Sequence, residues 1–186
     1  MLINEYYPQF FTATILEWKH LLVEDKYKDI IIESLRFLVK EKRVIIYSSV
    51  IMPNHIHIIW QIQGEPKREN VQRDFLKFTA QKIKYDLKDN YQNLLKQFAV
   101  NAKDRQYQLW ERNPLSIDIY DRKVFMEKLN YIHHNPVQEK WNLCRYPEDY
   151  KYSTVKFYET GKDNWGFLAA VVGVVTNNRS RAMKIL

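Results

Sequence analysis

The chain has 186 residues, enough for one domain with a well-filled core, and its 29 Lys and Arg against 22 Asp and Glu give a net charge of +7. One cysteine excludes an internal disulfide and a cysteine-only metal cluster, and four glycines without a Gly-rich loop argue against nucleotide-triphosphate chemistry. No apolar stretch approaches the roughly 20 residues that span a bilayer, and no signal-peptide pattern is seen, so we expect a cytoplasmic protein without a membrane partner. The basic, aromatic-rich composition suits nucleic acid and ordinary solubility charge equally.

The first part of the chain alternates strand and helix patterns. Residues 10–15 are rich in β-branched and aromatic side chains and predict a strand, and apolar steps of three and four predict a helix over 21–42. Two further strand patterns follow at 44–51 and 55–62. The short Met-Pro-Asn segment between them predicts a hairpin.

A second helix is predicted over residues 69–88, with Leu76, Ala80, Ile83 and Leu87 as its inner stripe. The opposite face is basic. A solvated helix face commonly has this pattern, and a track for DNA phosphates is the alternative that we carry forward. That candidate DNA-binding stripe consists of Arg73, Lys77, Lys84 and Lys88.

The last elements complete an α+β pattern. Residues 90–105 predict a polar loop with at most one helical turn, and 107–110 with 115–119 predict an interrupted strand. Asp121 is placed to cap a final helix that Pro136 ends. The order strand, helix, strand, strand, helix, strand, helix predicts a ferredoxin-like antiparallel sheet with helices mainly on one face.

Two histidines mark the strand over 55–62. Side chains alternate along a strand, so His55 and His57 share one face while Ile56, Ile58 and Trp60 share the other. Two neutral imidazoles on a rigid strand can bind a divalent cation. Two half-exposed strand histidines without a ligand are the simpler alternative.

The end of the final helix carries a phenol and a carboxamide one turn apart. Tyr131 and Asn135 are spaced i, i+4, beside the apolar stripe of Phe125, Leu129 and Ile132. A packing tyrosine and a helix-capping asparagine would explain each residue separately. Their combination with the His-x-His strand favours a single reaction centre.

These segments resemble a known family. The strand PNHIHIIW and the helix end FMEKLNYIHHNPV are similar to the REP-associated tyrosine transposases of the HUH single-tyrosine transposase superfamily. The segments KFTAQKI (77–83), QLWER (108–112) and PEDYKYSTVKFY (147–158) agree as well. The resemblance spans about residues 10–168, so we assign residues 1–168 to one HUH endonuclease domain and 169–186 to a tail of unknown role.

The resemblance implies a set of roles for the site residues. His55, His57 and Asn135 would bind a divalent metal, Mg²⁺ or Mn²⁺, and Tyr131 would be the nucleophile. The implied partner is single-stranded or hairpin DNA, cleaved through a 5′-phosphotyrosine and then rejoined by transesterification. The implied protein is a monomer or homodimer associated with the nucleoid.

Some assignments remain open at the level of sequence. His134 lies about 60° around the helix from Tyr131, within reach of a phosphate or a proton-shuttle role, and is a candidate auxiliary residue. His133 points away and suits packing or solvent. Two other functions compete with the transposase: a DNA-binding regulator that holds hairpins without cutting, and a histidine-metal RNA endonuclease.

Overall fold

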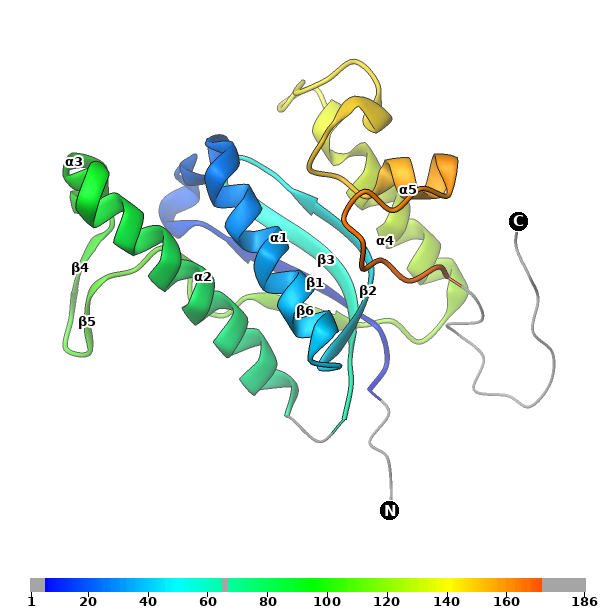
Figure 1. The fold of residues 1–186 in the computed structure, drawn as a ribbon, viewed down its shortest axis with the longest axis horizontal. Helices are drawn as coiled ribbons and strands as arrows, with labels where there is room; N and C mark the ends of the chain where they lie inside the picture. The colour runs from blue at the N-terminus through cyan, green and yellow to red at the C-terminus, as the bar shows by residue number, and fades with distance from the viewer. Residues whose placement is uncertain (1–5, 65–66, 172–186) are drawn as a thin grey trace.

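The computed structural model describes residues 6–64 and 67–171 (Figure 1). Its main sheet has the strand order β2-β3-β1-β6, and each neighbouring pair is antiparallel. This order and the βαββαβ connection are ferredoxin-like, as predicted. The strands are β1 (Gln9–Thr14), β2 (Val44–Ile51), β3 (His55–Ile62) and β6 (Leu115–Asp118).

Two long helices cover one face of the sheet. α1 (Asp25–Lys40) and α2 (Arg68–Asn90) pack with Ile56, Ile58 and Trp60 of β3 in the larger hydrophobic core. Side-chain alternation sends every second residue of β3 into this core. The histidines between them therefore point to the opposite face.

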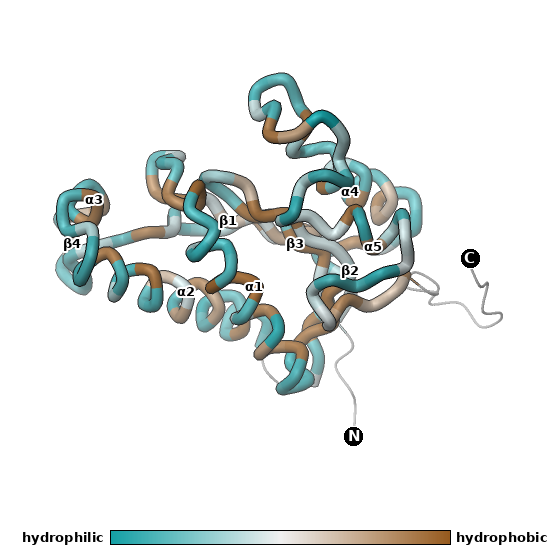
Figure 2. The backbone as a smooth tube through the Cα atoms, turned by 45° about the horizontal axis from the view of Figure 1, so that its top comes forward, coloured by the Kyte–Doolittle hydropathy of each residue, from teal (hydrophilic) through white to brown (hydrophobic). Residues whose placement is uncertain are grey.

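A third helix covers that opposite face. Phe125, Leu129 and Ile132 of α4 (Arg122–His134) pack with Phe10 and Ile59 in a second core. Figure 2 shows the strands between α1 and α2 on one side and α4 on the other. The expected placement of helices mainly on one face holds for α1 and α2; α4 departs from it.

A small hairpin replaces the predicted loop over 90–105. α3 (Gln92–Lys96) is followed by β4 (Ala99–Ala102) and β5 (Arg105–Tyr107), which pair antiparallel and project away from the main sheet in Figure 1. Local hydropathy gives no strong strand signal here because the side chains are exposed or half-buried. The strand predicted over 107–110 is not continuous. Tyr107 ends β5, and Trp110 forms an isolated antiparallel bridge to Ile15, the residue after β1.

Short elements link and close the fold. The 3₁₀ turns in the described ranges are Leu16–Trp18, Leu21–Val23, Asn135–Val137 and Pro147–Asp149, and the last helix within those ranges is α5 (Val155–Thr160). The Ala169 amide donates to the Ile46 carbonyl at 2.9 Å, and Ala169 and Val171 pack against the second core. The start of the predicted tail is therefore part of the fold, whereas its residues 172–186 lie outside the described residues. Within the described ranges no helix is long and apolar enough to cross a membrane.

The cap predicted for the final helix is present. Asp121 accepts a hydrogen bond from the Val124 amide at 2.9 Å, which satisfies one of the free donors at the start of α4. The helix ends at His134, so Asn135 begins the next 3₁₀ turn. Capping at one end and apolar packing along one side fix α4 on the sheet.

Leu129→Ala tests how strongly packing holds α4 in place. Leu129 is buried, so its truncation should lower the free energy of unfolding by about 2–5 kcal/mol, through lost burial and a cavity. Urea denaturation measures this change. Met126→Ala on the same helix removes a side chain that is 37% exposed and should cost below about 1 kcal/mol. Equal losses for the two variants would contradict the packing of α4 described above.

Candidate active site

His55 and His57 lie side by side on a central strand of the sheet. Their ring centroids are 4.7 Å apart, and the residues are only 4% and 5% exposed. The His57 ring also stacks on Phe10 at 5.2 Å. Both histidines are therefore buried, and the alternative of two half-exposed strand histidines is wrong.

One nitrogen of each ring is held by a neighbouring polar side chain. His55 Nδ1 lies 2.7 Å from Asn54 Oδ1, and His57 Nδ1 lies 2.7 Å from Thr12 Oγ1. Because the Asn54 oxygen can only accept, the His55 proton sits on Nδ1 and its Nε2 keeps a lone pair. The Thr12 hydroxyl can fix His57 in the same tautomer. Metal-binding histidines are commonly oriented by such partners.

Burial keeps both imidazoles neutral. Loss of solvation, with the Lys140 charge as a smaller cause, lowers the His55 pKa to about 4. The His57 pKa is also well below its ordinary value, first through burial and then through His55, Lys140 and Lys128. Neutral imidazole is the form that binds a cation, so no proton has to be displaced at pH 7.

Tyr131 of α4 contacts His57 from the helix that covers the histidine face of the sheet. Its ring centroid is 5.1 Å from that of His57 and 6.0 Å from that of Phe10. The residue is 42% exposed, so a large substrate can approach a phenol whose helix is anchored by buried neighbours. The structure thus brings together residues that are far apart in the sequence.

Asn135 lies one turn beyond Tyr131 and is fully buried. Among the described residues neither its Oδ1 nor its Nδ2 has a hydrogen-bond partner, and His57 Nε2 is likewise buried and unpaired. Unpaired buried polar atoms are costly and call for an explanation. Across 6–64 and 67–171, no cluster of three or more His, Cys, Asp or Glu could hold a metal. A third protein ligand beside two imidazoles would thus be another residue type, and the free amide oxygen of Asn135 suits that role.

The other predicted residues lie outside this group. His134 is exposed and its Nδ1 donates to the Asn130 carbonyl at 2.9 Å, whereas His133 is buried against Tyr158. The basic stripe of Arg73, Lys77, Lys84 and Lys88 belongs to α2, on the face of the sheet away from the histidines. Arg73 in that stripe pairs with Asp74.

Two lysines that the sequence patterns did not indicate lie beside the histidines. Lys128 Nζ lies 5.0 Å from the centroid of the Phe10 ring, which stacks on His57, and Lys140 Nζ lies 5.7 Å from that of Trp141, which contacts His55. Neither lysine forms an ion pair with another described residue. Their position beside the site, together with Thr12 and Asn54, depends on strand register and loop packing, for which local sequence patterns give no signal.

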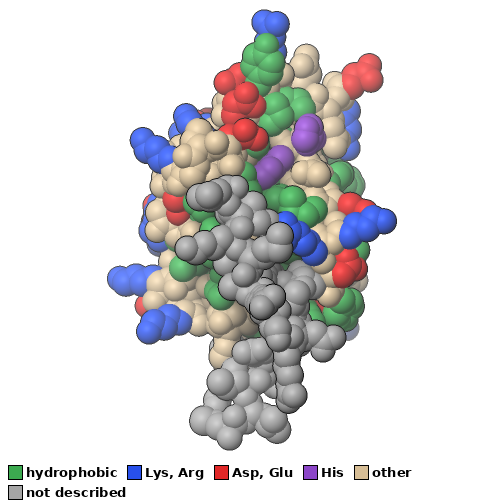
Figure 3. Space-filling model, turned by 90° about the vertical axis from the view of Figure 1, so that its right-hand side faces the viewer, with side chains coloured by type: hydrophobic (Ala, Val, Ile, Leu, Met, Phe, Trp, Pro, Cys, Tyr) green, Lys and Arg blue, Asp and Glu red, His purple; other side chains and the backbone are tan. Residues whose placement is uncertain are grey.

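The surface on this side combines the same features. Figure 3, which faces the α4 and α5 side, shows histidine side chains with hydrophobic groups beside them and with both basic and acidic side chains around them.

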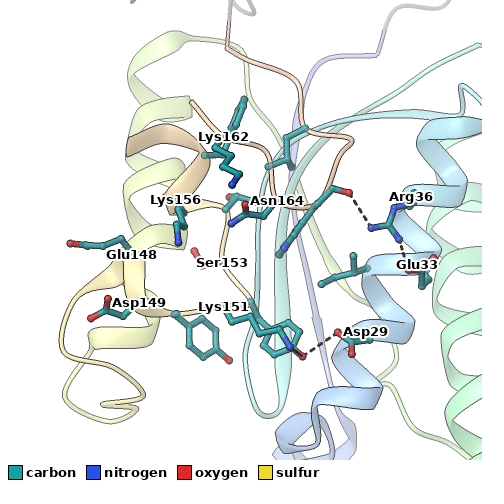
Figure 4. Close-up of a pocket in the computed structure, with 17 residues that line it drawn as sticks. Asp29, Glu33, Arg36, Glu148, Asp149, Lys151, Ser153, Lys156, Lys162 and Asn164 are labelled. Carbon is teal, nitrogen blue, oxygen red and sulfur yellow. Dashed lines mark hydrogen bonds and ion pairs between the residues drawn. The ribbon is translucent and has the colours of Figure 1, made fainter. Parts of the chain in front are cut away.

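A separate cavity lies between α1 and the segment 148–168. Its volume is about 620 Å³, and Figure 4 shows Lys156, Lys162 and Asn164 facing Arg36 and Glu33 across it. Arg36 donates to the Trp165 carbonyl at 3.0 Å and also pairs with Glu33. The lining contains none of the two histidines, Tyr131 and Asn135, so this cavity is distinct from the site.

Thr12→Val tests whether the strand-borne hydroxyl orients His57. The valine keeps the shape but removes the hydrogen bond, so affinity for Mn²⁺ should fall about 10-fold or more. Thr12→Ser keeps a hydroxyl and should retain most of the affinity. Isothermal titration calorimetry measures both. Unchanged Mn²⁺ binding in the valine variant would rule out this role.

Acid should destabilise the protein through buried histidines. Burial, and secondarily His134, lowers the His133 pKa from 6.5 to about 4. The unfolded chain then binds more protons than the folded one between those values, so stability is full above about pH 6.5 and falls as the pH drops toward 4. His133 alone should contribute about 2 kcal/mol of loss between pH 7 and 5. Urea unfolding of His133→Gln should show a correspondingly weaker pH dependence, and an equal dependence in both proteins would contradict the assignment.

Comparison with known proteins identifies the fold. No protein-family model matches the chain, and a search of curated proteins gives no match. Among solved structures it is similar to a REP-associated tyrosine transposase bound to a REP hairpin, with a TM-score of 0.61 and 19% sequence identity. The match covers 100% of this chain and 96% of the other. The resemblance seen in the sequence is thus confirmed at the level of the α+β fold: the chain has the fold of a REP-associated tyrosine transposase.

Proposed function

We propose that this protein is a metal-dependent tyrosine transposase that nicks single-stranded, hairpin-associated DNA and rejoins the strands. The observation that carries the proposal is the contact of Tyr131 with His57, 5.1 Å between ring centroids, with the His55 ring 4.7 Å from that of His57. Asn135, one turn beyond Tyr131, adds a buried amide without a partner among the described residues. The similarity of the whole fold to a transposase bound to a REP hairpin supports it. Hairpin binding alone would require neither the phenol nor its two imidazole neighbours.

The reaction is a pair of transesterifications. The Tyr131 oxygen attacks a backbone phosphorus, the bond from phosphorus to the 3′ oxygen breaks, and that oxygen leaves as a 3′-OH. The 5′ side remains on Tyr131 as a phosphotyrosine ester. A 3′-OH of another strand then attacks this ester and regenerates the phenol. One phosphodiester is exchanged for another, so no nucleotide triphosphate is consumed.

A phenol is a weak nucleophile at neutral pH and needs a favourable electrostatic setting. His55, His57 and Asn135 would hold Mg²⁺ or Mn²⁺, which neutralises charge developing on the scissile phosphate and the leaving oxygen. A site with both nitrogen and oxygen ligands suits Mn²⁺ better than Mg²⁺, because Mg²⁺ prefers oxygen ligands. Thr12 and Asn54 keep the two rings in place, and α4 presents the phenol.

Both halves of the site come from one chain. Tyr131 contacts His57 of the same chain, so no second copy is required to complete the pair. We therefore propose that the site acts in cis within one protomer, in either a monomer or a homodimer. Association with nucleoid DNA in the cytoplasm follows from the proposed substrate.

Tyr131→Phe tests the nucleophile. Wild-type protein incubated with Mn²⁺ or Mg²⁺ and hairpin DNA from beside its own gene should gain the mass of a DNA fragment, mapped to Tyr131 by intact-mass analysis and digestion. Tyr131→Phe should show only background. Tyr146→Phe, at a tyrosine of similar exposure (49%), should react like the wild type. An adduct that persists in Tyr131→Phe would refute the assignment.

The same experiment separates the competing functions. Chelation of the metal should abolish the adduct; adduct formation that survives EDTA would contradict metal dependence. Tight DNA binding without an adduct under either metal would favour the regulatory hairpin-binding protein. Cleavage of RNA without a covalent adduct would favour the histidine-metal RNA endonuclease.

Charge reversal tests the phosphate track on α2. Lys77→Glu with Lys84→Glu should weaken DNA binding and reduce the slope of log Kd against log salt by about 1.4, because each single-strand phosphate contact contributes roughly 0.7. Fluorescence anisotropy over a salt series measures the slope. Lys128→Glu with Lys140→Glu is the matched pair beside the histidines. A slope that changes only in that second pair would move the track to the α4 face.

A further inference from the structure

An exposed tryptophan borders the candidate site. Trp18 is 61% exposed, and its ring lies edge-to-face against His55 at 6.2 Å between centroids. The His55 ring also contacts Trp141 at 5.4 Å between centroids, and the His20 ring lies 5.9 Å from that of Trp141. A tryptophan this exposed contributes little to a core, so packing of the fold does not account for it.

The backbone that presents Trp18 is strained. Glu17 and Trp18 have φ values of 54° and 56°, the left-handed region that bulky side chains avoid. Contacts from two other segments hold it: Glu111 Oε1 accepts from the Glu17 amide at 2.7 Å, and Asn54 Nδ2 donates to the Trp18 carbonyl at 3.0 Å. Strain maintained by such contacts concentrates at functional sites.

Asn54 ties this loop to the candidate metal ligand. Its amide nitrogen holds the Trp18 carbonyl while its oxygen accepts from His55 Nδ1 at 2.7 Å. One side chain therefore fixes both the exposed indole and the imidazole. Nearby, the Glu17 carboxylate pairs with Lys19, and Lys140 stands exposed beside Trp141. Lys19 thus offsets the Glu17 charge, which would otherwise repel a phosphate.

We propose that Trp18 is the platform on which an unpaired DNA base next to the scissile phosphate stacks. An indole face offers stacking to any unpaired base, whereas bases within a duplex are already stacked on their neighbours. Stacking beside His55 would fix the strand so that the adjoining phosphate faces Tyr131. Trp18 is thus a positioning residue for single-stranded substrate, and this role rests on the proposed function.

A double-mutant cycle between protein and DNA tests the platform. The probe is the hairpin oligonucleotide from beside the gene, with each base of its single-stranded flank replaced in turn by an abasic site. Anisotropy gives Kd with Mn²⁺ in a Tyr131→Phe background, which prevents cleavage. Trp18→Ala should weaken binding of the intact probe about tenfold, and one abasic position should weaken the Trp18 protein by a similar factor. That same abasic site should have no further effect on Trp18→Ala.

Two controls separate stacking from disturbance of the loop. Trp18→Phe retains an aromatic face and should recover most of the affinity and of the coupling to the abasic position. Tyr120→Ala removes a similarly exposed aromatic (63%) that lies outside α2 and outside the candidate site, and it should leave Kd unchanged. If every abasic site weakens Trp18→Ala as much as the Trp18 protein, the platform is refuted.

The test of the Trp18 platform and the test of the proposed nicking activity can fail independently of each other. Adduct formation by the protein with Tyr131 intact is measured on the same oligonucleotide. An adduct without coupling between Trp18 and any base refutes the platform and leaves the transposase proposal standing. Coupling without an adduct supports the platform and refutes the nicking activity.

Discussion

The antiparallel register of β1 against β3 is the constraint on which the site depends. It places Thr12 opposite His57 and Thr14 opposite His55, and it leaves Ile56, Ile58 and Trp60 for the core under α1 and α2. A shift of one residue would turn both histidines into that core and the isoleucines toward Tyr131. Burial of the apolar residues on one face therefore fixes the imidazoles on the other, and α4 has to lie on the imidazole face for Tyr131 to meet them.

The site departs from what stability alone would favour. His57 Nε2 and the Asn135 amide are buried without partners in the described part of the chain, and each such group costs about 1–3 kcal/mol. Two buried imidazoles that stay neutral add an acid sensitivity, since folding opposes their protonation. A buried group that lowers stability and lies against an exposed phenol, as His57 does against Tyr131, is expected of a functional centre.

Much of this arrangement could be predicted from local patterns. The strands at 44–51 and 55–62, the Asp121 cap and the faces of the His-x-His strand were correctly predicted, because alternation and capping are properties of neighbouring residues. The hairpin of β4 and β5 was not predicted, since its strands are short and exposed. The face of the sheet covered by α4 and the pairing of Thr12 with His57 were not predicted either. A helix stripe shows that a helix packs but not against which face, and cross-strand register is set only in the assembled sheet.

Coordination of a metal by the two strand histidines beside Tyr131 is the central claim. Pulsed electron paramagnetic resonance of Mn²⁺ bound to the protein tests it most directly, because nitrogens bound to the ion give ¹⁴N hyperfine couplings. We predict coupling to two imidazole nitrogens in the wild type and to one in either His55→Gln or His57→Gln. Bound Mn²⁺ without nitrogen coupling, or with the same two couplings in both variants, would contradict the account.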